Sequence, residues 1–513
     1  MTQPAAASAR PGSTPPVPLT AVVAWTGATL RPAAAGATPV TGVSLSSQRV
    51  HPGDLYAALP GARVHGARFA RDALASGAVA VLTDPEGASL LEELLPDGVP
   101  VPVLVVERPR AVLGDLAARV YAEPARALRL VAVTGTQGKT TTTRLLDGAL
   151  TAAGVPSAVI GTVGTRIRGR DIATGLTTPE APDLHALFAV MVEEGVRACT
   201  MEVSSHALVM GRVDGVRFDV AGFLNLGRDH LDFHRDEEDY FAAKASLFTP
   251  ERAARGVVNV DDPWGRRLLR VTQVPVVTCS VGGDADWRAV DVEQGPAGSS
   301  FTVVGPDGGA HRAHVPLAGS FNVANALCAV ALAGEAGLDA AAVAAGMAEA
   351  GGVPGRLERV EAGQDYLALV DYAHKPDAVT AVLEALRPAT EGRLLLVIGA
   401  GGDRDTGKRP VMGEIAARLA DVVVVTDDNP RTEDPASIRL EVLRGARSVP
   451  GGADIVEVAD RRDAIRHVVA LAGPGDTVVV AGKGHETGQT VGATTHPFDD
   501  RVELRRAIEE AGS

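Results

Sequence analysis

Residues 131–144 read VAVTGTQGKTTTTR, and this stretch decides the fold of the middle of the chain. An apolar run, Leu130 to Val133, leads into a glycine turn, then Lys139, then threonines that open a helical stretch. The order strand, glycine turn, helix is typical of a phosphate-binding loop. The common spacing G-x-x-x-x-G-K-[ST] requires a glycine where this chain has Val133. The sequence therefore predicts a shortened loop, Thr134 to Thr140.

The same stretch could be a plain turn with its lysine in solvent, and only the context favours a ligand site. A strand before the loop and a helix after it direct backbone N–H groups and a helix N-terminus at phosphate oxygens. Lys139 would then supply a point charge, and the Thr140 hydroxyl could bind Mg²⁺.

Composition excludes several classes of protein. A chain of 513 residues predicts about three domains at roughly 150 residues each. The net charge of −14, without a long basic block, argues against nucleic acid or an anionic membrane as a partner. Three cysteines far apart in sequence, without a C-x-x-C pair, suggest neither a zinc site nor a disulfide framework. Apolar runs no longer than a strand predict a cytoplasmic protein.

The chain divides into a tail and three α/β regions. We expect a mobile tail over residues 1–18, rich in Pro, Ala and Ser, followed by domains over residues 19–124, 125–350 and 351–513. In the last two regions, continuous apolar runs end in polar clusters, as in VVVVTDDNPR. Such runs predict parallel sheets covered on both faces, with ligands beyond the carboxyl ends of the strands.

Two polar clusters of the middle region are candidate metal ligands. In TMEVSSHAL a strand ends at Glu202, where a carboxylate would hold a nucleotide-bound metal, although a strand-end acid is also common. In NLGRDHLDFH the cluster Asp229, His230, Asp232 and His234 can bind a metal or form a solvated acidic loop. His230 is the best ligand candidate.

The helix expected in DEEDYFAAKASLF places Lys244 on an apolar face. Tyr240, Lys244, Leu247 and Phe248 follow the spacing i, i+4, i+7 and i+8. A lysine on such a face either extends its ammonium to solvent or has a buried partner, such as a carboxylate, a phosphate or a covalent adduct.

Three motifs of the last region, GGDRD, DDNPRTEDP and AGKGHE, follow predicted strands. They place Arg404, Arg431 and Glu486 at neighbouring strand ends, where guanidinium forks can bind a carboxylate. Each arginine alone could be a surface ion pair. Together with the acid, they favour a ligand that carries both carboxylate and ammonium groups.

These motifs in this order resemble the Mur ligases of peptidoglycan synthesis, and among them the tripeptide synthetases, over nearly the whole chain after the tail. The resemblance also covers TTPE, GSFNVANAL, GVPGRLE and DYAHKPDA. The family's phosphate loop lacks the first glycine, which accounts for Val133. The resemblance implies a small N-terminal uridine-binding domain, a central P-loop ATPase-like domain with a mostly parallel sheet, and a Rossmann-like C-terminal domain.

The resemblance implies an ATP-dependent ligase that joins a third amino acid to UDP-MurNAc-L-Ala-D-Glu through an acyl phosphate. DNPR is the form associated with diaminopimelate, whose second carboxylate suits Arg431. The family also implies Mg²⁺, a CO₂-derived carbamate on Lys244, and a cytoplasmic monomer. The stereochemistry of the diaminopimelate stays open.

The resemblance assigns residues to four roles. ATP would contact Gly135, Thr136, Gln137, Gly138, Lys139, Thr140, Thr141, Asn322, Asn325, Arg356 and Asp371. The metal ions would be held by Thr140, Glu202, His230 and carbamylated Lys244. UDP-MurNAc-dipeptide would contact Ser47, Thr177, Thr178, Ser204 and Arg212. The amino acid would contact Arg404, Asp428, Asn429, Pro430, Arg431, Gly482 and Glu486.

Four positions depart from the family pattern. Met210 replaces a glutamine that contacts the muramoyl peptide, and Gln137 replaces the usual asparagine of the phosphate loop. Ser46 and Gln48 replace an aspartate and an arginine near the uridine site. Two other readings compete: a related ligase, lysine-adding or similar to folylpolyglutamate synthase, and a catalytically silent muropeptide- or nucleotide-binding module.

Overall fold

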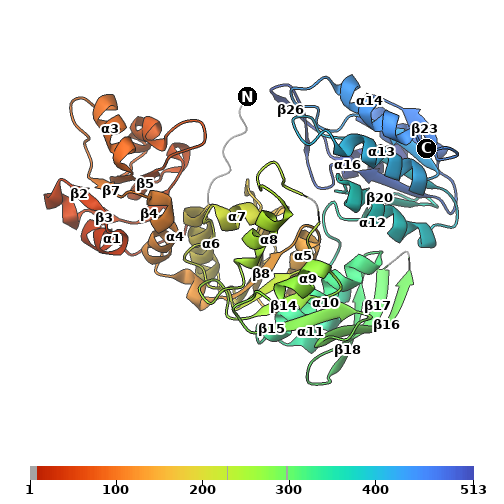
Figure 1. Cartoon of the computed structure of the whole chain (residues 1–513), viewed down its shortest axis with the longest axis horizontal. Coiled ribbons are helices and arrows are strands. Elements are labelled where there is room, and N and C mark those ends of the chain that lie inside the picture. The colour runs from red at the N-terminus through yellow and green to blue at the C-terminus, as the bar shows by residue number, and fades with distance from the viewer. Residues whose placement is uncertain (1–8, 228, 296–297, 513) are drawn as a thin grey trace.

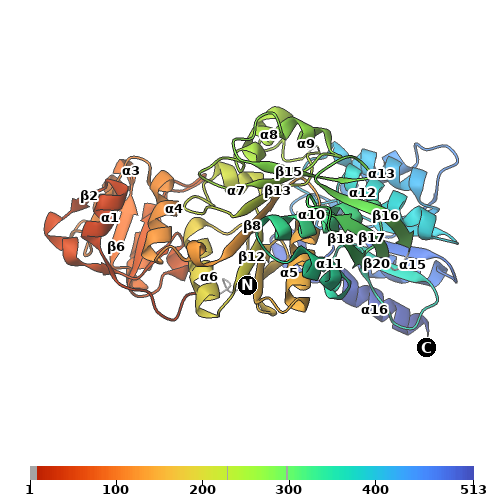
Figure 2. The same cartoon turned by 90° about the horizontal axis from the view of Figure 1, so that it is seen from below.

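The computed structural model describes residues 9–227, 229–295 and 298–512, which fold into three α/β bodies arranged along the long axis of the molecule (Figure 1). Each body has its own main sheet, of five, eleven and six strands in chain order. The view from below shows the central body between the other two (Figure 2). The α/β fold with three domains is confirmed.

The N-terminal sheet has the strand order β2-β7-β6-β5-β4, with three parallel pairings and β2 antiparallel at one edge. Its strands are β2 (Thr29–Arg31), β4 (Gly42–Ser44), β5 (Asp54–Ala58), β6 (Ala80–Thr83) and β7 (Val103–Val105). Its helices are α1 (Leu19–Thr26), α2 (Ala70–Ala75), α3 (Pro85–Leu94) and α4 (Pro109–Val120). Helices α1 and α4 share a core with β5 and β6, which closes one face of the sheet.

Residues 9–18 pack against the protein, although the sequence predicted a mobile tail over residues 1–18. Arg10 forms an ion pair with Asp54 at 3.0 Å and contacts the Tyr121 hydroxyl. Strand β1 (Val17–Pro18) pairs with β3 (Pro39–Val40). A buried carboxylate needs a cation, and Arg10 supplies it from a segment whose composition gives no sign of order. Residues 1–8 lie outside the described residues.

The central sheet has the order β11-β10-β9-β12-β8-β13-β14-β15-β16-β17-β18, and the seven strands from β9 to β16 run parallel. These seven are β8 (Arg129–Thr134), β9 (Ser157–Gly161), β12 (Ala198–Glu202), β13 (Val220–Phe223), β14 (Gly256–Asn259), β15 (Val276–Val281) and β16 (Trp287–Gly295). Antiparallel hairpin strands extend both edges: β10 (Gly164–Ile167), β11 (Arg170–Ile172), β17 (Gly298–Val304) and β18 (Ala310–Val315). The sheet is thus mostly parallel, as predicted.

Helices cover both faces of this sheet, which explains the continuous apolar runs. Val131 and Val133 of β8 pack with α5 (Lys139–Ala152), α10 (Ser320–Glu335) and α11 (Ala340–Gly346). Leu130 and Ala132 point to the other face, toward α6 (Ala181–Glu193) and α8 (Glu237–Ala245). Two short helices, α7 (Ser205–Val209) and α9 (Pro263–Leu268), follow β12 and β14.

The C-terminal sheet has the order β19-β20-β24-β21-β22-β23, parallel except for the short β19 (Glu358–Arg359). Its other strands are β20 (Leu367–Asp371), β21 (Leu394–Ile398), β22 (Val422–Val425), β23 (Asp454–Glu457) and β24 (Thr477–Ala481). Its helices are α12 (Pro376–Leu386), α13 (Lys408–Leu419), α14 (Pro435–Ala446), α15 (Arg461–Leu471) and α16 (Asp500–Ala511), and the hairpin β25 (Gly488–Val491) and β26 (Thr494–Pro497) follows β24.

One detail differs from what the sequence suggested. Helix α8 ends at Ala245, and Leu247 and Phe248 follow in tight turns whose N–H groups bond three residues back. The three cysteines are free, although the buried Sγ atoms of Cys279 and Cys328 lie 3.0 Å from each other. Within the described residues, no helix is both long and apolar enough to cross a membrane.

Candidate active site at the phosphate loop

The phosphate loop joins the end of β8 to the start of α5, as the sequence predicted. Gly138 has φ 84°, a left-handed conformation that favours glycine. A Cβ atom at this position would lie 2.3 Å from Oδ1 of Asn325. Thr140 and Thr141 are buried in the first turn of α5, at the N-terminus of the helix. The backbone conformation and the approach of Asn325 both require glycine here.

Asn225, which the sequence analysis did not single out, fixes the shape of the loop. Its side-chain Oδ1 accepts hydrogen bonds from the backbone N–H groups of Thr136 and Gln137 at 3.1 and 2.9 Å. Its Nδ2 donates to the Gln137 carbonyl at 3.2 Å. Asn225 lies two residues after β13, the strand beside β8, and this position at a strand end was the available signal.

Two lysines, the half-buried Lys139 and the buried Lys244, donate to one carbonyl oxygen of the loop. Lys139 Nζ lies 2.7 Å and Lys244 Nζ 2.8 Å from the oxygen of Gly135. Lys244 is 1% exposed, which confirms that it points inward from α8. Burial, and then the charge of Lys139, lower the pKa of Lys244 well below its usual value. Burial lowers the pKa of Lys139 to about 8, while Glu202 opposes this shift. Such a site suits anions.

Glu202 ends β12 and is buried beside the loop. Its two carboxylate oxygens accept hydrogen bonds from the backbone N–H and the hydroxyl of Thr162, at 2.8 and 2.9 Å. Glu202 pairs in register with Val133 of β8, so its side chain lies at the same sheet edge as the phosphate loop. Thr162 is the orienting residue that the sequence analysis missed.

The acidic and histidine cluster after β13 divides into two parts. His230 has φ 54° and its Nε2 lies 3.1 Å from Oδ2 of Asp229. Burial lowers the pKa of His230 to about 4, so its imidazole is neutral and can act as a ligand. His234 is buried against Ser205, 2.9 Å away, which is a structural contact. Asp232 is exposed.

The predicted nucleotide residues come from two domains. Asn322 and Asn325 bond to each other at 3.2 Å on the first turns of α10, beside the loop. Arg356, from the segment that leads into the C-terminal domain, donates to the Thr140 hydroxyl at 3.4 Å. Asp371 ends β20 and accepts the backbone N–H groups of Leu357 and Ala373, each at 2.7 Å. Arg356 therefore joins the C-terminal domain to the phosphate loop.

Four of the five residues predicted for the muramoyl peptide lie beside Glu202. The Thr178 hydroxyl donates to the Glu202 carbonyl at 2.9 Å and accepts from the backbone N–H of Ser204 at 3.2 Å. Thr177 contacts Thr162, and Arg212 forms an ion pair with Glu180 at 2.9 Å. Ser47 is the exception, because it lies in the N-terminal domain.

Of the four positions that depart from the family pattern, Met210 and Gln137 have contacts that can be described. The Met210 sulfur is 3.6 Å from Nη2 of Arg212, so this side chain packs on the arginine where a glutamine is usual. The backbone N–H of Gln137 donates a hydrogen bond to the side chain of Asn225. Ser46 is half-buried and Gln48 is exposed.

The residues predicted to select the amino acid gather where β22 and β24 end. Asn429 donates to Glu486 at 2.8 Å, and its Oδ1 accepts from Lys483 at 3.1 Å. Lys483 is fully buried and was not predicted to act in this site. Gly482 has φ 118°, and a Cβ atom there would lie 2.4 Å from Oδ2 of Asp428.

The two predicted arginines differ in their surroundings. The Arg431 guanidinium donates to the Gly402 carbonyl, and its backbone N–H donates to Thr490 at 3.0 Å. Arg431 follows Pro430, whose carbonyl accepts from Glu433. Arg404 is exposed and forms no hydrogen bond or ion pair with the described residues. The structure thus brings Arg431, but not Arg404, into contact with a neighbouring strand-end loop.

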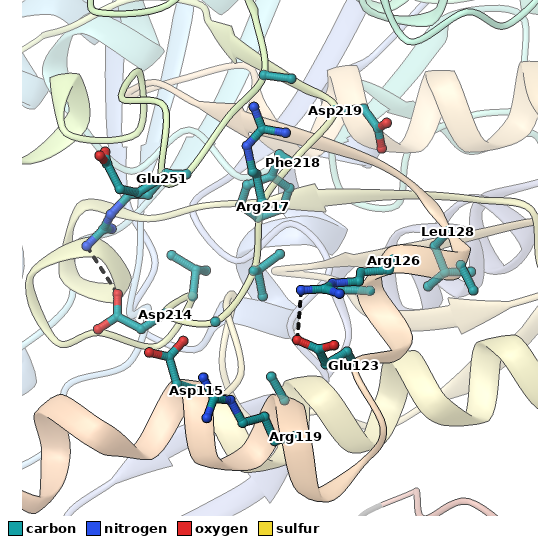
Figure 3. A pocket seen from close by; sticks show the side chains of 18 of the residues that line it. Asp115, Arg119, Glu123, Arg126, Leu128, Asp214, Arg217, Phe218, Asp219 and Glu251 are labelled. Carbon is teal, nitrogen blue, oxygen red and sulfur yellow. Dashed lines mark hydrogen bonds and ion pairs between the residues drawn. The ribbon is translucent and has the colours of Figure 1, made fainter. Parts of the chain in front are cut away.

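A cavity of about 1040 Å³ lies at the opposite edge of the central sheet (Figure 3). Its lining includes Arg129 at the start of β8 and Asp219 just before β13. Several of its charged groups form ion pairs, as in Glu123 with Arg126 at 2.9 Å. Its lining residues include none of those predicted for the site at the carboxyl ends of the strands.

The loop, the buried carboxylate and the two sheets define a phosphate-loop nucleotide-binding protein. Family models match all three parts: "Mur ligase family, catalytic domain" at residues 39–121, "Mur ligase middle domain" at 133–333 and "Mur ligase, glutamate ligase domain" at 355–484. The chain belongs to the Mur ligase family.

Similar proteins span the whole chain. A UDP-N-acetylmuramoyl-L-alanyl-D-glutamate--2,6-diaminopimelate ligase of Streptomyces avermitilis is 56% identical over 92% of this chain and 93% of its own length. A UDP-N-acetylmuramyl-tripeptide synthetase of Leifsonia xyli subsp. xyli is 45% identical over the full length of both chains. A solved structure of a diaminopimelate ligase is 35% identical with a TM-score of 0.66, and the match covers 93% of this chain and 96% of that one.

The loop geometry predicts that Gly138→Ala weakens nucleotide binding while Gly154→Ala does not. Both glycines have positive φ, but Gly154 has open space around it. Each substitution should destabilise the protein by about 1–2 kcal/mol, and only Gly138→Ala should also displace Asn325. We expect a loss of ADP affinity of at least tenfold, measured by calorimetry, for Gly138→Ala alone. Equal affinities of the two variants would contradict this account.

Proposed function

We propose that the protein is a tripeptide synthetase of the MurE type, which joins diaminopimelate to the D-Glu carboxylate of UDP-MurNAc-L-Ala-D-Glu with ATP. The observation that carries the proposal is the contact of Arg356 with Thr140, because it brings the strand-end cluster of the C-terminal domain to the phosphate loop. An amine held by one domain can then reach an acyl group activated in the other.

The chemistry has two steps. The D-Glu carboxylate attacks the γ-phosphorus of ATP, releasing ADP and forming an acyl phosphate. The amine of diaminopimelate attacks the acyl carbon, and phosphate leaves with the bonding electron pair as the amide forms. Lys139 holds the β- and γ-phosphates and neutralises their charge, while Asn322 and Asn325 flank the nucleotide. Such catalysis depends on positioning and on electrostatic stabilisation.

The donor set fits Mg²⁺ at the phosphate loop. Thr140 supplies a hydroxyl and Glu202 a carboxylate held by Thr162, and hard oxygen ligands suit this ion. His230 and Lys244 both face the ring of Tyr240, at 5.9 Å between ring centroids and 4.5 Å from Nζ to the centroid. They would hold a second ion. When bound there, Mg²⁺ would supply positive charge that neutralises the phosphate groups.

Lys244 would take part as a carbamate. A neutral amine is the form that adds to CO₂, and the lowered pKa of Lys244 favours that form. The product is an anion in place of a cation, so the repulsion between Lys139 and Lys244 becomes an attraction. Carbamylation also supplies the oxygen ligands that an ammonium group lacks.

The third amino acid would be selected at Asp428 to Arg431, with Glu486 and Gly482 opposite. Arg431 suits the distal carboxylate of diaminopimelate, and Asn429 and Glu486 suit the ammonium and carboxylate of an amino acid. The Streptomyces avermitilis relative is named for diaminopimelate, whereas the Leifsonia xyli name leaves the amino acid open. We propose diaminopimelate, because lysine lacks the second carboxylate that the Arg431 guanidinium would bind.

The alternatives are less well supported. A Mycobacterium tuberculosis folylpolyglutamate synthase structure, 21% identical, shares the fold over 71% of this chain. A silent binding module would have no need to bury Glu202 and Lys244 beside Lys139. We propose a cytoplasmic, monomeric enzyme of peptidoglycan precursor synthesis, without nucleic acid or membrane as a partner.

The proposed reaction is tested by phosphate release from ATP with UDP-MurNAc-L-Ala-D-Glu and each of meso-diaminopimelate, LL-diaminopimelate and L-lysine. We expect turnover with a diaminopimelate isomer and at least 100-fold less with lysine, with product masses that confirm the amide. Preference for lysine would overturn the selectivity, and absence of turnover with all three would favour the silent module.

Replacing Arg431 should weaken the binding of the amino acid substrate and leave the binding of ATP unchanged. Losing a charged contact costs about 2–3 kcal/mol, so Arg431→Ala should raise KM for diaminopimelate by about 30- to 150-fold and change KM for ATP little. Arg418→Ala, which removes an exposed ion pair with Glu414 in α13, is the control. Equal changes in both KM values for Arg431→Ala would show that Arg431 does not select the substrate.

Replacing Lys244 should abolish ligation, and adding bicarbonate to the variant should not restore its activity. We expect Lys244→Ala to lower kcat at least 100-fold, because it removes the site of carbamylation. Carbon-13 NMR of the wild-type protein in ¹³C-bicarbonate should show a carbamate signal that Lys244→Ala lacks. Wild-type turnover in the variant, or the same signal in both proteins, would refute the role of Lys244.

A further inference from the structure

The chain uses lysine sparingly, and every lysine lies near the site. Of the 49 Lys and Arg residues only five are lysines: Lys139, Lys244, Lys375, Lys408 and Lys483. None of the five is exposed, whereas arginines supply the exposed cations. Lysine carries a compact ammonium with three donors, whereas arginine carries a planar guanidinium. In this chain the ammonium groups lie near the site and the guanidinium groups supply the positive surface charge. Lys375 and Lys408 have no role in the proposed reaction.

The side chain of Lys375, in the C-terminal domain, contacts the central domain. Its Nζ contacts Oδ2 of Asp229, the same oxygen that lies 3.1 Å from Nε2 of His230. The other oxygen of Asp229 accepts the backbone N–H of His230 at 2.9 Å. The side chains are 22% and 13% exposed, so little water screens the pair. One carboxylate thus receives contacts from the C-terminal domain and from the predicted metal ligand.

The backbone around Lys375 is fixed from its own domain. Lys408 donates to the carbonyl of His374 at 3.0 Å, and Nδ1 of His374 lies 2.7 Å from the Tyr372 carbonyl. Helix α12 begins at Pro376, the residue after Lys375. Lys375 is therefore held at the N-terminus of a helix and directed out of its domain. Burial lowers the pKa of both Lys139 and Lys244, and the charge of Lys375 adds to this lowering.

We propose that Lys375 is a positioning residue whose ion pair with Asp229 seats the C-terminal domain on the phosphate loop, so that the bound amine meets the acyl phosphate before water does. This inference rests on the proposed function. When seating fails, water takes the place of the amine: it attacks the acyl phosphate, and the products are the free D-Glu carboxylate and phosphate. Loss of Lys375 therefore separates ATP consumption from ligation.

The test compares Lys375→Met and Lys375→Arg with Arg462→Met, which removes an ion pair with Glu503 inside the C-terminal domain. We measure phosphate released per tripeptide formed. Wild type and Arg462→Met should give a ratio of one. Lys375→Met should lower the rate of tripeptide formation at least 30-fold and raise the ratio above two, and Lys375→Arg should bring it part of the way back. A ratio of one in Lys375→Met would overturn the proposal, whatever the rate, because simple misfolding lowers both rates equally.

A second measurement does not depend on turnover. Small-angle scattering with an ATP analogue should show a larger radius of gyration for Lys375→Met than for wild type and Arg462→Met. An unchanged radius would overturn the seating role even if ligation slowed. If wild type forms no tripeptide, the proposed function fails, and the scattering result still decides whether Lys375 holds the domains together.

Discussion

The architecture depends on one electrostatic constraint, the meeting of Lys139 and Lys244 at the carbonyl oxygen of Gly135. Both Nζ atoms bond this oxygen, so they lie no more than about 5.5 Å apart. Two full charges at that distance repel by roughly 3 kcal/mol at an effective dielectric constant of 20. The repulsion disappears when Lys244 is neutral, and it reverses when an anion lies between them. Arg356 adds a further positive charge beside the loop, so an anion is the kind of ligand that suits this place.

The parallel sheets place the remaining groups around this point. Glu202, Asn225 and the phosphate loop follow three adjacent strands, and their side chains meet because parallel strands end at one edge. Asn429 and Glu486 occupy the equivalent edge of the C-terminal sheet. Each edge alone could bind a ligand. The reaction requires both edges to face each other, and the polar contacts that join them include those of Arg356 and Lys375.

The sequence predicted those parts of the site that depend on local order. The loop was predicted from the order of strand, glycines and helix, and Glu202 from its place at the end of an apolar run. The inward direction of Lys244 was predicted from the helical spacing of its apolar neighbours. The roles of Asn225 and Thr162, and the contact of Asp229 with Lys375, were not predicted, because they depend on partners 40 to 146 residues away. The packing of Arg10 on Asp54 and the antiparallel edge strands of the central sheet are likewise products of tertiary contacts that local composition does not encode.

The N-terminal domain relates to the site through Glu180. This carboxylate lies 3.1 Å from Arg110 of α4 and 2.9 Å from Arg212, which also donates to the Thr178 carbonyl at 3.4 Å. Thr178 in turn holds the backbone at Glu202. These contacts join the N-terminal domain to the backbone of the strand that ends at the buried acid. Binding energy gained far from the reacting carboxylate is useful to catalysis only if it positions the reacting end, and that requires the two domains to be held together in this way.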